Sequence, residues 1–172
     1  MQHTIDLAAT LKFPEFERDT EYIALVSDDS EYPLLSGDIG STDGIRLDKK
    51  DYRKATNEFV VPHSSAKHAK ASRDSYMVGA LARLNLNYDK LHPKAKALAD
   101  QLGMKPIVIN PFLNTVAQLI ECVHSLEEGI TILKDLQNKG INYDEQVVVG
   151  LNEKGTIPVK AGEGVGAVEV PR

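Results

Sequence analysis

The stretch NPFLNTVAQLIECVHSLEEGITILKDLQNK, residues 110–139, decides the fold of this chain. Its apolar residues recur every three or four positions, at Leu113, Val116, Ile120, Val123, Leu126, Ile130, Leu133 and Leu136. This spacing predicts one long helix with an apolar stripe, which Gly140 would end. We therefore expect a core helix over about residues 110–139 to form the spine of the fold.

Two shorter helices are predicted from their apolar spacing and from the residues at their ends. Pro93 suits the first turn of a helix that ends at Gly103. Residues 3–12 predict a short helix that Pro14 would end. Residues 77–86 form an apolar run that contains a glycine and an arginine, so a strand and a helix both remain open there.

The first quarter of the chain favours β structure. Residues 22–26 and 32–35 predict two short strands, and the polar turn residues 27–30 between them predict a hairpin. The turn Asp43-Gly44 predicts a second hairpin, in which residues 45–47 form a third strand. An antiparallel hairpin region is therefore expected at the N-terminal end.

The remaining segments complete the predicted fold. Asp48 is a good N-cap for a helix over residues 49–59, and residues 62–75 are polar and predicted to be irregular. Short strands are predicted at residues 146–149 and 156–160. The fold class is therefore α+β, with the hairpin region packed on several helices and short β segments near the C-terminal end. With no repeat, low-complexity tract or clear linker, residues 1–172 predict a single domain.

Composition excludes several classes of function. The formal net charge is −5, with 20 basic and 25 acidic residues interspersed, which argues against a nucleic-acid partner. No apolar run approaches the roughly 20 residues that cross a bilayer, and residues 1–13 lack the pattern of a signal peptide. Because Cys122 is the single cysteine, no internal disulfide and no multi-cysteine metal site can form within these residues. A reducing, cytoplasmic location is expected.

Arg83 stands out because it interrupts an apolar run. A guanidinium there is costly unless it is paired or reaches the surface. One interpretation is an amphipathic element with Arg83 extended outward into solvent. The other is a buried ion pair, for which Glu121 or Glu169 would supply the acid.

Three other groups have ordinary structural explanations. His63 and His68 are five residues apart in a polar loop without a third ligand, so we expect them to face solvent. Cys122 lies one step from the apolar stripe of the long helix, where core packing is the simplest explanation. Glu121 and His124 are three residues apart on that helix and are expected to share a local polar contact.

The glycine-rich end matches a GxGxxA spacing over residues 162–167, which raises the question of a dinucleotide site. The context does not suit one, because residues 168–171 are β-branched and end in Pro171 where a helix would have to begin. A glycine-rich turn that lets the backbone approach another group closely is the better interpretation. The chain stops at Arg172, directly after this turn, and we expect it to be part of a longer catalyst.

Three segments together resemble the middle of the nickel-iron hydrogenase large subunit. They are HSSAK at residues 63–67, YMVGALARLN at 76–85 and GVGAVEVPR at 164–172. The second and third are similar to the family's VGALAR and GxGxxEAPRG segments, and their order and spacing agree. The resemblance spans most of the chain and is nearest to the cytosolic, NAD(P)-linked or sulfur-reducing hydrogenases. Val170 departs from it, because the family usually has alanine there.

The resemblance implies reversible oxidation of dihydrogen to protons and electrons, with electrons leaving through an iron-sulfur small subunit. It implies a nickel-iron centre held by two CxxC pairs in the full-length parent, and neither pair is present in residues 1–172. Cys122 does not correspond to any of those four ligands. No metal is therefore expected in these residues alone, which should be inactive without the remaining parts of the large subunit. If those parts are missing, the exposed side of the long helix should be unusually apolar.

The resemblance also implies roles for individual residues. Pro171 and Arg172 match the pair that lines the pocket of the iron's diatomic ligands, with the arginine over the open coordination position. A guanidinium suits that place because it is permanently charged and presents several directed donors. Glu169 matches the glutamate just before that pair and would orient nearby groups. Lys67 and Arg83 match positions with a supportive role, and Glu121 is the expected partner of Arg83.

Two rival functions belong to other classes. The first is a hydrogenase-related binding or assembly module that never carries metal, for which a native gene ending after Arg172 would be decisive. The second is a small nucleotide-binding protein, which predicts that NAD(P) binds the isolated chain. Calorimetry at millimolar NAD(P) would decide the second.

Overall fold

A computed structural model describes residues 2–55, 57–140, 142 and 161–162. The predicted α+β class is confirmed, and the strands predicted at 146–149 and 156–160 lie outside the described residues. The elements follow one another as α1 Gln2–Thr10, β1 Glu21–Val26, β2 Asp38–Ser41, β3 Arg46–Leu47, η1 Lys49–Asp51, α2 Tyr52–Ala55, β4 Asn57–Phe59, β5 His68–Lys70, β6 Tyr76–Met77, α3 Ala80–Asn87, η2 Tyr88–Lys90, α4 Pro93–Gln101, η3 Pro111–Leu113 and α5 Asn114–Lys139.

The main sheet has the strand order β3-β2-β1-β6. Strand β1 pairs antiparallel with β2 and parallel with β6, and β2 pairs antiparallel with β3 across the predicted Asp43-Gly44 turn. The strand predicted at residues 32–35 is wrong, because those residues belong to the loop between β1 and β2. Pro33 lacks the N–H that a paired strand needs, and Tyr32 instead turns its buried side chain toward α5.

The helix predicted at residues 49–59 is shorter than expected. Asp48 does cap it, since its Oδ1 accepts from the N–H of Lys50 at 2.8 Å, but helical structure ends at Ala55. Strand β4 follows and pairs antiparallel with β5, with Phe59 opposite His68. The prediction of an irregular stretch is therefore wrong at β5, because this pairing joins segments that local sequence patterns do not connect.

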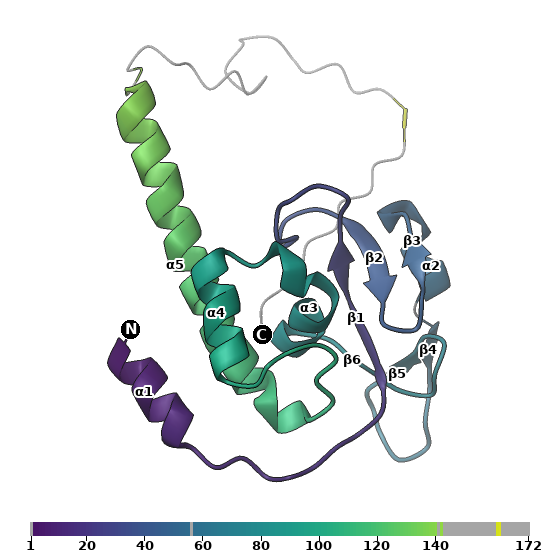
Figure 1. Ribbon diagram of the computed structural model, residues 1–172. Helices are drawn as coiled ribbons and strands as arrows, with labels where there is room; N and C mark the ends of the chain where they lie inside the picture. The colour runs from purple at the N-terminus through teal and green to yellow at the C-terminus, as the bar shows by residue number, and fades with distance from the viewer. Residues whose placement is uncertain (1, 56, 141, 143–160, 163–172) are drawn as a thin grey trace.

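The open question at residues 77–86 is answered by a short strand followed by a helix. Strand β6 ends at Met77, Gly79 has a positive φ of 93°, and α3 begins at Ala80. Helix α3 lies at the centre of the molecule, between β1 and α5 (Figure 1). Its residues from Ala80 to Leu84 are all 0% exposed, so α3 is the middle of the hydrophobic core.

The helix predicted from Pro93 to Gly103 and the long helix predicted to end at Gly140 are confirmed as α4 and α5. Pro93 starts α4, and Gly103 follows its end with a φ of 72°. Helix α5 covers 26 residues and is followed by Gly140, whose φ is 79°. Both glycines have a positive φ, which glycine adopts at lower steric cost than residues with a side chain. Helices α4 and α5 pack side by side, which fixes the first half of α5 against the core.

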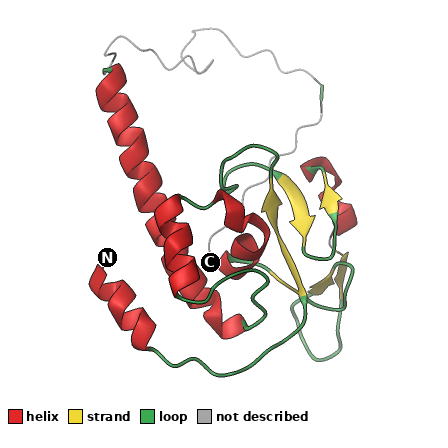
Figure 2. Ribbon diagram, in the orientation of Figure 1, coloured by secondary structure: helices red, strands yellow, loops and turns green. Residues whose placement is uncertain are grey.

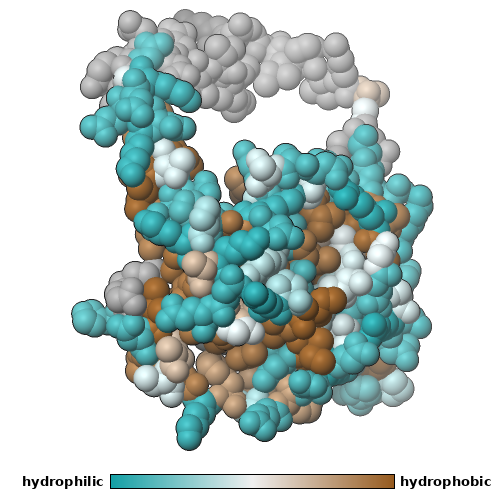
Figure 3. All heavy atoms as spheres, viewed as in Figure 1, coloured by the Kyte–Doolittle hydropathy of each residue, from teal (hydrophilic) through white to brown (hydrophobic). Residues whose placement is uncertain are grey.

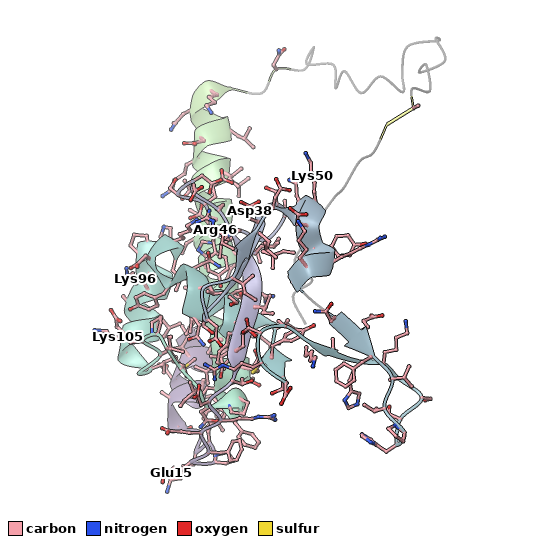
Figure 4. The ribbon with its side chains drawn as sticks, turned by 90° about the vertical axis from the view of Figure 1, so that its right-hand side faces the viewer. Glu15, Asp38, Arg46, Lys50, Lys96 and Lys105 are labelled. Carbon is pink, nitrogen blue, oxygen red and sulfur yellow. The ribbon has the colours of Figure 1, made fainter. Side chains whose placement is uncertain are left out.

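Helices and strands occupy different sides of the molecule. Figure 2 shows α1, α4 and α5 away from the strands, with α3 between the two groups and only α2 on the strand side. Figure 4, turned by 90°, shows the β4–β5 hairpin standing away from the main sheet, and the labelled side chains of Glu15, Lys50 and Lys105 pointing outward. Among the described residues, no helix combines the length and the apolar character that crossing a bilayer requires.

The apolar stripe of α5 winds around the helix instead of following one side. Its eight residues, from Leu113 just before α5 to Leu136, have a mean spacing of about 3.3, below the 3.6 residues of one helical turn, so the stripe falls behind by about 30° per step on average. The stripe therefore starts in the core, where Ile120 is 0% exposed, and leaves it after Val123. Leu126 is 51% exposed and Leu133 is 67% exposed. The long helix is thus half buried and half uncovered.

Candidate functional site

The predicted catalytic segment cannot be placed. Glu169, Pro171 and Arg172 lie outside the described residues, and Gly162, just before them, is exposed. Their roles therefore stay predictions. The described part of the chain does bring together other residues that were singled out, at a buried polar cluster between the β1–β2 loop, α3 and α5.

Arg83 and Glu121 form the centre of this cluster. Arg83 lies on the central helix α3 with 0% exposure, so it does not extend outward into solvent. Its Nε donates to Oε1 of Glu121 at 2.6 Å, and its Nη2 donates to Oε2 at 2.7 Å. This two-point contact matches the geometry of a guanidinium to that of a carboxylate. Glu121, one of the two acids that were open, is thus a partner of Arg83, and Glu169 lies outside the described residues.

Tyr32 is a member of the cluster that the sequence patterns did not predict. Its hydroxyl donates to Oε1 of Glu121 at 2.9 Å, across 89 residues of sequence. The Glu121 carboxylate therefore receives donors from both α3 and the β1–β2 loop. The aromatic residue at position 32 was a local sign of a buried side chain, but no pattern of spacing identified its acceptor.

His124 extends the cluster by one turn of α5. Its Nδ1 accepts from the backbone N–H of His92 at 3.0 Å, and its ring lies 4.9 Å from that of Tyr32. Burial lowers the pKa of His124 below its ordinary value, and His92 acts in the same direction while Glu128 and Glu121 oppose it. Glu121 and His124, which were expected to share a local polar contact, have different hydrogen-bond partners, and Tyr32 contacts both side chains.

A cavity opens beside this cluster. It has a volume of about 550 Å³, and Tyr32, His124, Lys90 and Glu128 are among the residues that line it. Lys90 donates to the backbone oxygen of Ser27 at 2.6 Å, which ties η2 to the end of β1. The cluster itself can fix three elements relative to one another, and its ionic groups are already paired within the fold. The arrangement of the cluster is therefore that of a structural support, which holds these elements together.

Lys67 is not part of the buried cluster. It lies exposed on the β4–β5 hairpin, where its Nζ is 3.1 Å from Oε2 of Glu58. His63 and His68 are exposed on the same hairpin, as expected, with ring centroids 5.4 Å apart. No group of three or more candidate ligands occurs among the described residues. The hairpin and the cluster are thus separate features.

Cys122 is exposed, so the prediction that it packs in the core is wrong. It follows Glu121 on α5, and because successive helical residues turn by about 100°, it points away from the buried side. A nickel-iron centre held by four thiolates does not fit residues 1–172, which contain one cysteine. Thiolates for such a centre would have to come from outside these residues.

Comparison with known proteins agrees with the motifs. No family model matches the chain. It is 31% identical to the Sulfhydrogenase 1 subunit alpha of Pyrococcus furiosus over an alignment 172 residues long, which covers 99% of this chain and 38% of that relative. It is 30% identical to the Sulfhydrogenase 2 subunit alpha of the same organism over 116 residues, 67% of this chain and 26% of the relative. The chain thus spans well under half the length of each. The resemblance carried by its motifs is confirmed: the chain is related to the hydrogenase alpha subunits.

Proposed function

We propose that residues 1–172 serve as the central part of the large subunit of a nickel-iron hydrogenase, folded as a single domain. The parent protein would reversibly oxidise dihydrogen to protons and electrons in the cytoplasm and pass the electrons to an iron-sulfur small subunit. The observation that carries this proposal is the match over 99% of the chain to a sulfhydrogenase alpha subunit. The motifs at residues 63–67, 76–85 and 164–172 point to the same family.

The chain would contribute surroundings to the metal centre and not its ligands. With one exposed cysteine, it lacks the thiolates that hold nickel and iron, so residues 1–172 alone are expected to be inactive. Arg172, preceded by Glu169 and Pro171, is proposed to present a permanent charge and directed donors at the reacting position. The buried pair of Arg83 and Glu121 is proposed to support this wall by holding α3 against α5.

The test uses the whole hydrogenase that contains this sequence, with hydrogen-dependent reduction of a dye as the assay. Arg172→Lys should keep nickel and iron content unchanged while lowering turnover by roughly 100-fold, because lysine keeps the charge but loses the forked donors. Arg46→Lys is the matched control, since Arg46 forms an exposed ion pair with Asp28 and should leave turnover unchanged. Normal turnover in the Arg172 variant would reject the role given to this residue.

A metal-free binding or assembly module is the second candidate, and the single cysteine favours it. Metal analysis of the protein isolated from its source cells separates the two. Nickel and iron in a stable complex with this chain support the hydrogenase, whereas a complex free of both metals and without hydrogen-dependent activity supports the module.

A further inference from the structure

Helix α5 has a second apolar face, which the described part of the chain does not cover. It consists of Cys122, Leu126, Gly129, Ile130, Leu133 and Leu136, and we refer to it as the outer face of α5. Ile130 is 42% exposed and Leu136 is 50% exposed, in addition to the greater exposure of Leu126 and Leu133. Figure 3 shows apolar side chains on the stretch of α5 that stands away from the rest of the molecule. A run of large exposed aliphatic residues on one helix marks an interaction surface.

The outer face lies on the opposite side of α5 from the core. At about 100° per residue, its members centre about 150° from the buried side that carries Val116, Ile120 and His124. Glu127 lies on the core side and confirms this direction, because its carboxylate pairs with Lys94 of α4 at 2.9 Å. The elements that cover the first half of α5 therefore cannot reach the outer face. A second layer is needed to bury it.

The sequence around the outer face suits a helix as its partner. Thr131, Lys134 and Asn138 fall on the opposite, polar side, so the second half of α5 is amphipathic, although Ile132, which is 57% exposed, lies outside the outer face. Gly129 lies within the outer face, and a side chain added there would meet nothing within 4 Å. Glycine in the middle of a helix is unfavourable relative to alanine, and no described neighbour requires it. Close approach of another helix at this point would explain it.

We propose that the outer face of α5 binds an amphipathic helix from the stretch of a hydrogenase alpha subunit that residues 1–172 do not span. The relative with 31% identity has most of its length outside the matched 38%, so it has ample chain to supply such a helix. Lys134 and Lys139 border the outer face toward the end of α5, and the docking helix should carry carboxylates there. Its residue opposite Gly129 should be large.

Photochemical cross-linking identifies the occupant directly. The protein is produced in its source cells with benzoylphenylalanine replacing Leu133, irradiated, and digested for mass spectrometry. The expected cross-linked peptide belongs to a hydrogenase alpha subunit and lies outside residues 1–172. Cross-links to a second copy of α5, to a small subunit or to an unrelated protein, or none at all, would overturn the proposal. The same group replacing Asn138, on the polar side, is the control and should give no such peptide.

The single cysteine supplies a second readout. In the assembled protein, docking should slow alkylation of Cys122 by at least about ten-fold relative to the denatured protein. Leu133→Asp should restore fast alkylation, because it places a charge in the covered face. Asn138→Asp adds the same charge on the polar side and should leave Cys122 protected. Equal reactivity in the two variants would contradict docking on this face.

Because this docking rests on the proposed function, the two are separated by measuring hydrogen-dependent activity on the same preparations. Activity together with cross-links to a small subunit would leave the hydrogenase function standing and remove the docking. Cross-links to an alpha-subunit segment without metals or activity would keep the docking and remove the function.

Discussion

The two halves of α5 are built from the same kinds of residue but have different surroundings. In the first half, Val116, Ile120 and Val123 are buried, and Glu121 is locked to Arg83. In the second half, Leu126, Ile130 and Leu133 continue the same spacing and are exposed. The period of an apolar stripe therefore determines which elements cover it, because a mean spacing of about 3.3 residues turns the stripe gradually away from its first partner.

The largest effect is expected at the buried ion pair. Glu121→Gln removes the charge that balances Arg83, whose side chain is 0% exposed, and should lower the free energy of unfolding by about 3–5 kcal/mol. Chemical denaturation followed by circular dichroism measures this. Asp135→Asn removes a carboxylate from the exposed half and should change stability by no more than about 0.5 kcal/mol. Similar losses in both variants would erase the contrast between the halves.

Two isoleucine substitutions, one in each half of α5, test the contrast between the halves without changing any charge. Ile120→Ala empties a fully buried site and should cost about 2–5 kcal/mol. Ile130→Ala changes the same side chain at a position that is 42% exposed and should cost less than about 0.5 kcal/mol in the isolated chain. Both are measured by urea denaturation at equal protein concentration. A large loss at Ile130 would mean that the second half is already covered.

The buried half should also respond to pH through His124. In the unfolded chain His124 titrates near 6.5, and burial lowers its pKa in the fold. Between the two pKa values the unfolded state binds more protons, so the free energy of unfolding should fall as the pH decreases below about 6.5. His124→Asn keeps an acceptor for the N–H of His92 and should flatten this dependence. An unchanged pH profile in the variant would show that other groups control it.

The smallest effect is expected at Gly129, where one substitution should stabilise the isolated chain but weaken docking in the assembled protein. Gly129→Ala should stabilise the isolated chain by about 0.5–1 kcal/mol, because alanine favours the helix and the added methyl meets nothing within 4 Å. In the assembled protein the same methyl should weaken docking on the outer face and speed alkylation of Cys122. Thermal denaturation of the chain and thiol labelling of the complex measure the two signs. Stabilisation in both would argue against close helix contact there.

Local patterns predicted the parts of the fold that depend on local residues. Helices α4 and α5 were predicted because apolar spacing, Pro93 and the terminal glycines all act within a few residues. Strands β4 and β5 were missed because their pairing joins Phe59 to His68, and nothing in either segment specifies the other. The loop around Tyr32 was taken for a strand because its aromatic and apolar residues suit one, while its acceptor lies on α5.

The candidate site, like the fold, could be predicted only where it depends on local residues. The cost of burying a guanidinium indicated that Arg83 needs an acid, but identifying Glu121 as a partner required the packing of α3 on α5. Cys122 was assigned to the core because it is next in sequence to residues of the apolar stripe. Successive residues of a helix are rotated by about 100°, however, and this rotation places Cys122 outside the core. Motifs identified the hydrogenase relationship, and the roles of Glu169, Pro171 and Arg172 stay predictions.

Because the two faces of α5 point in opposite directions, an insertion or deletion within this helix would change how they are oriented relative to each other. Inserting one residue between Glu121 and Leu126 would turn everything after it by about 100° relative to the ion pair, which points the outer leucines toward a different neighbour. An insertion of seven residues would restore their direction to within about 20°. Among natural relatives, length changes within this helix should therefore be rare and should come in sevens.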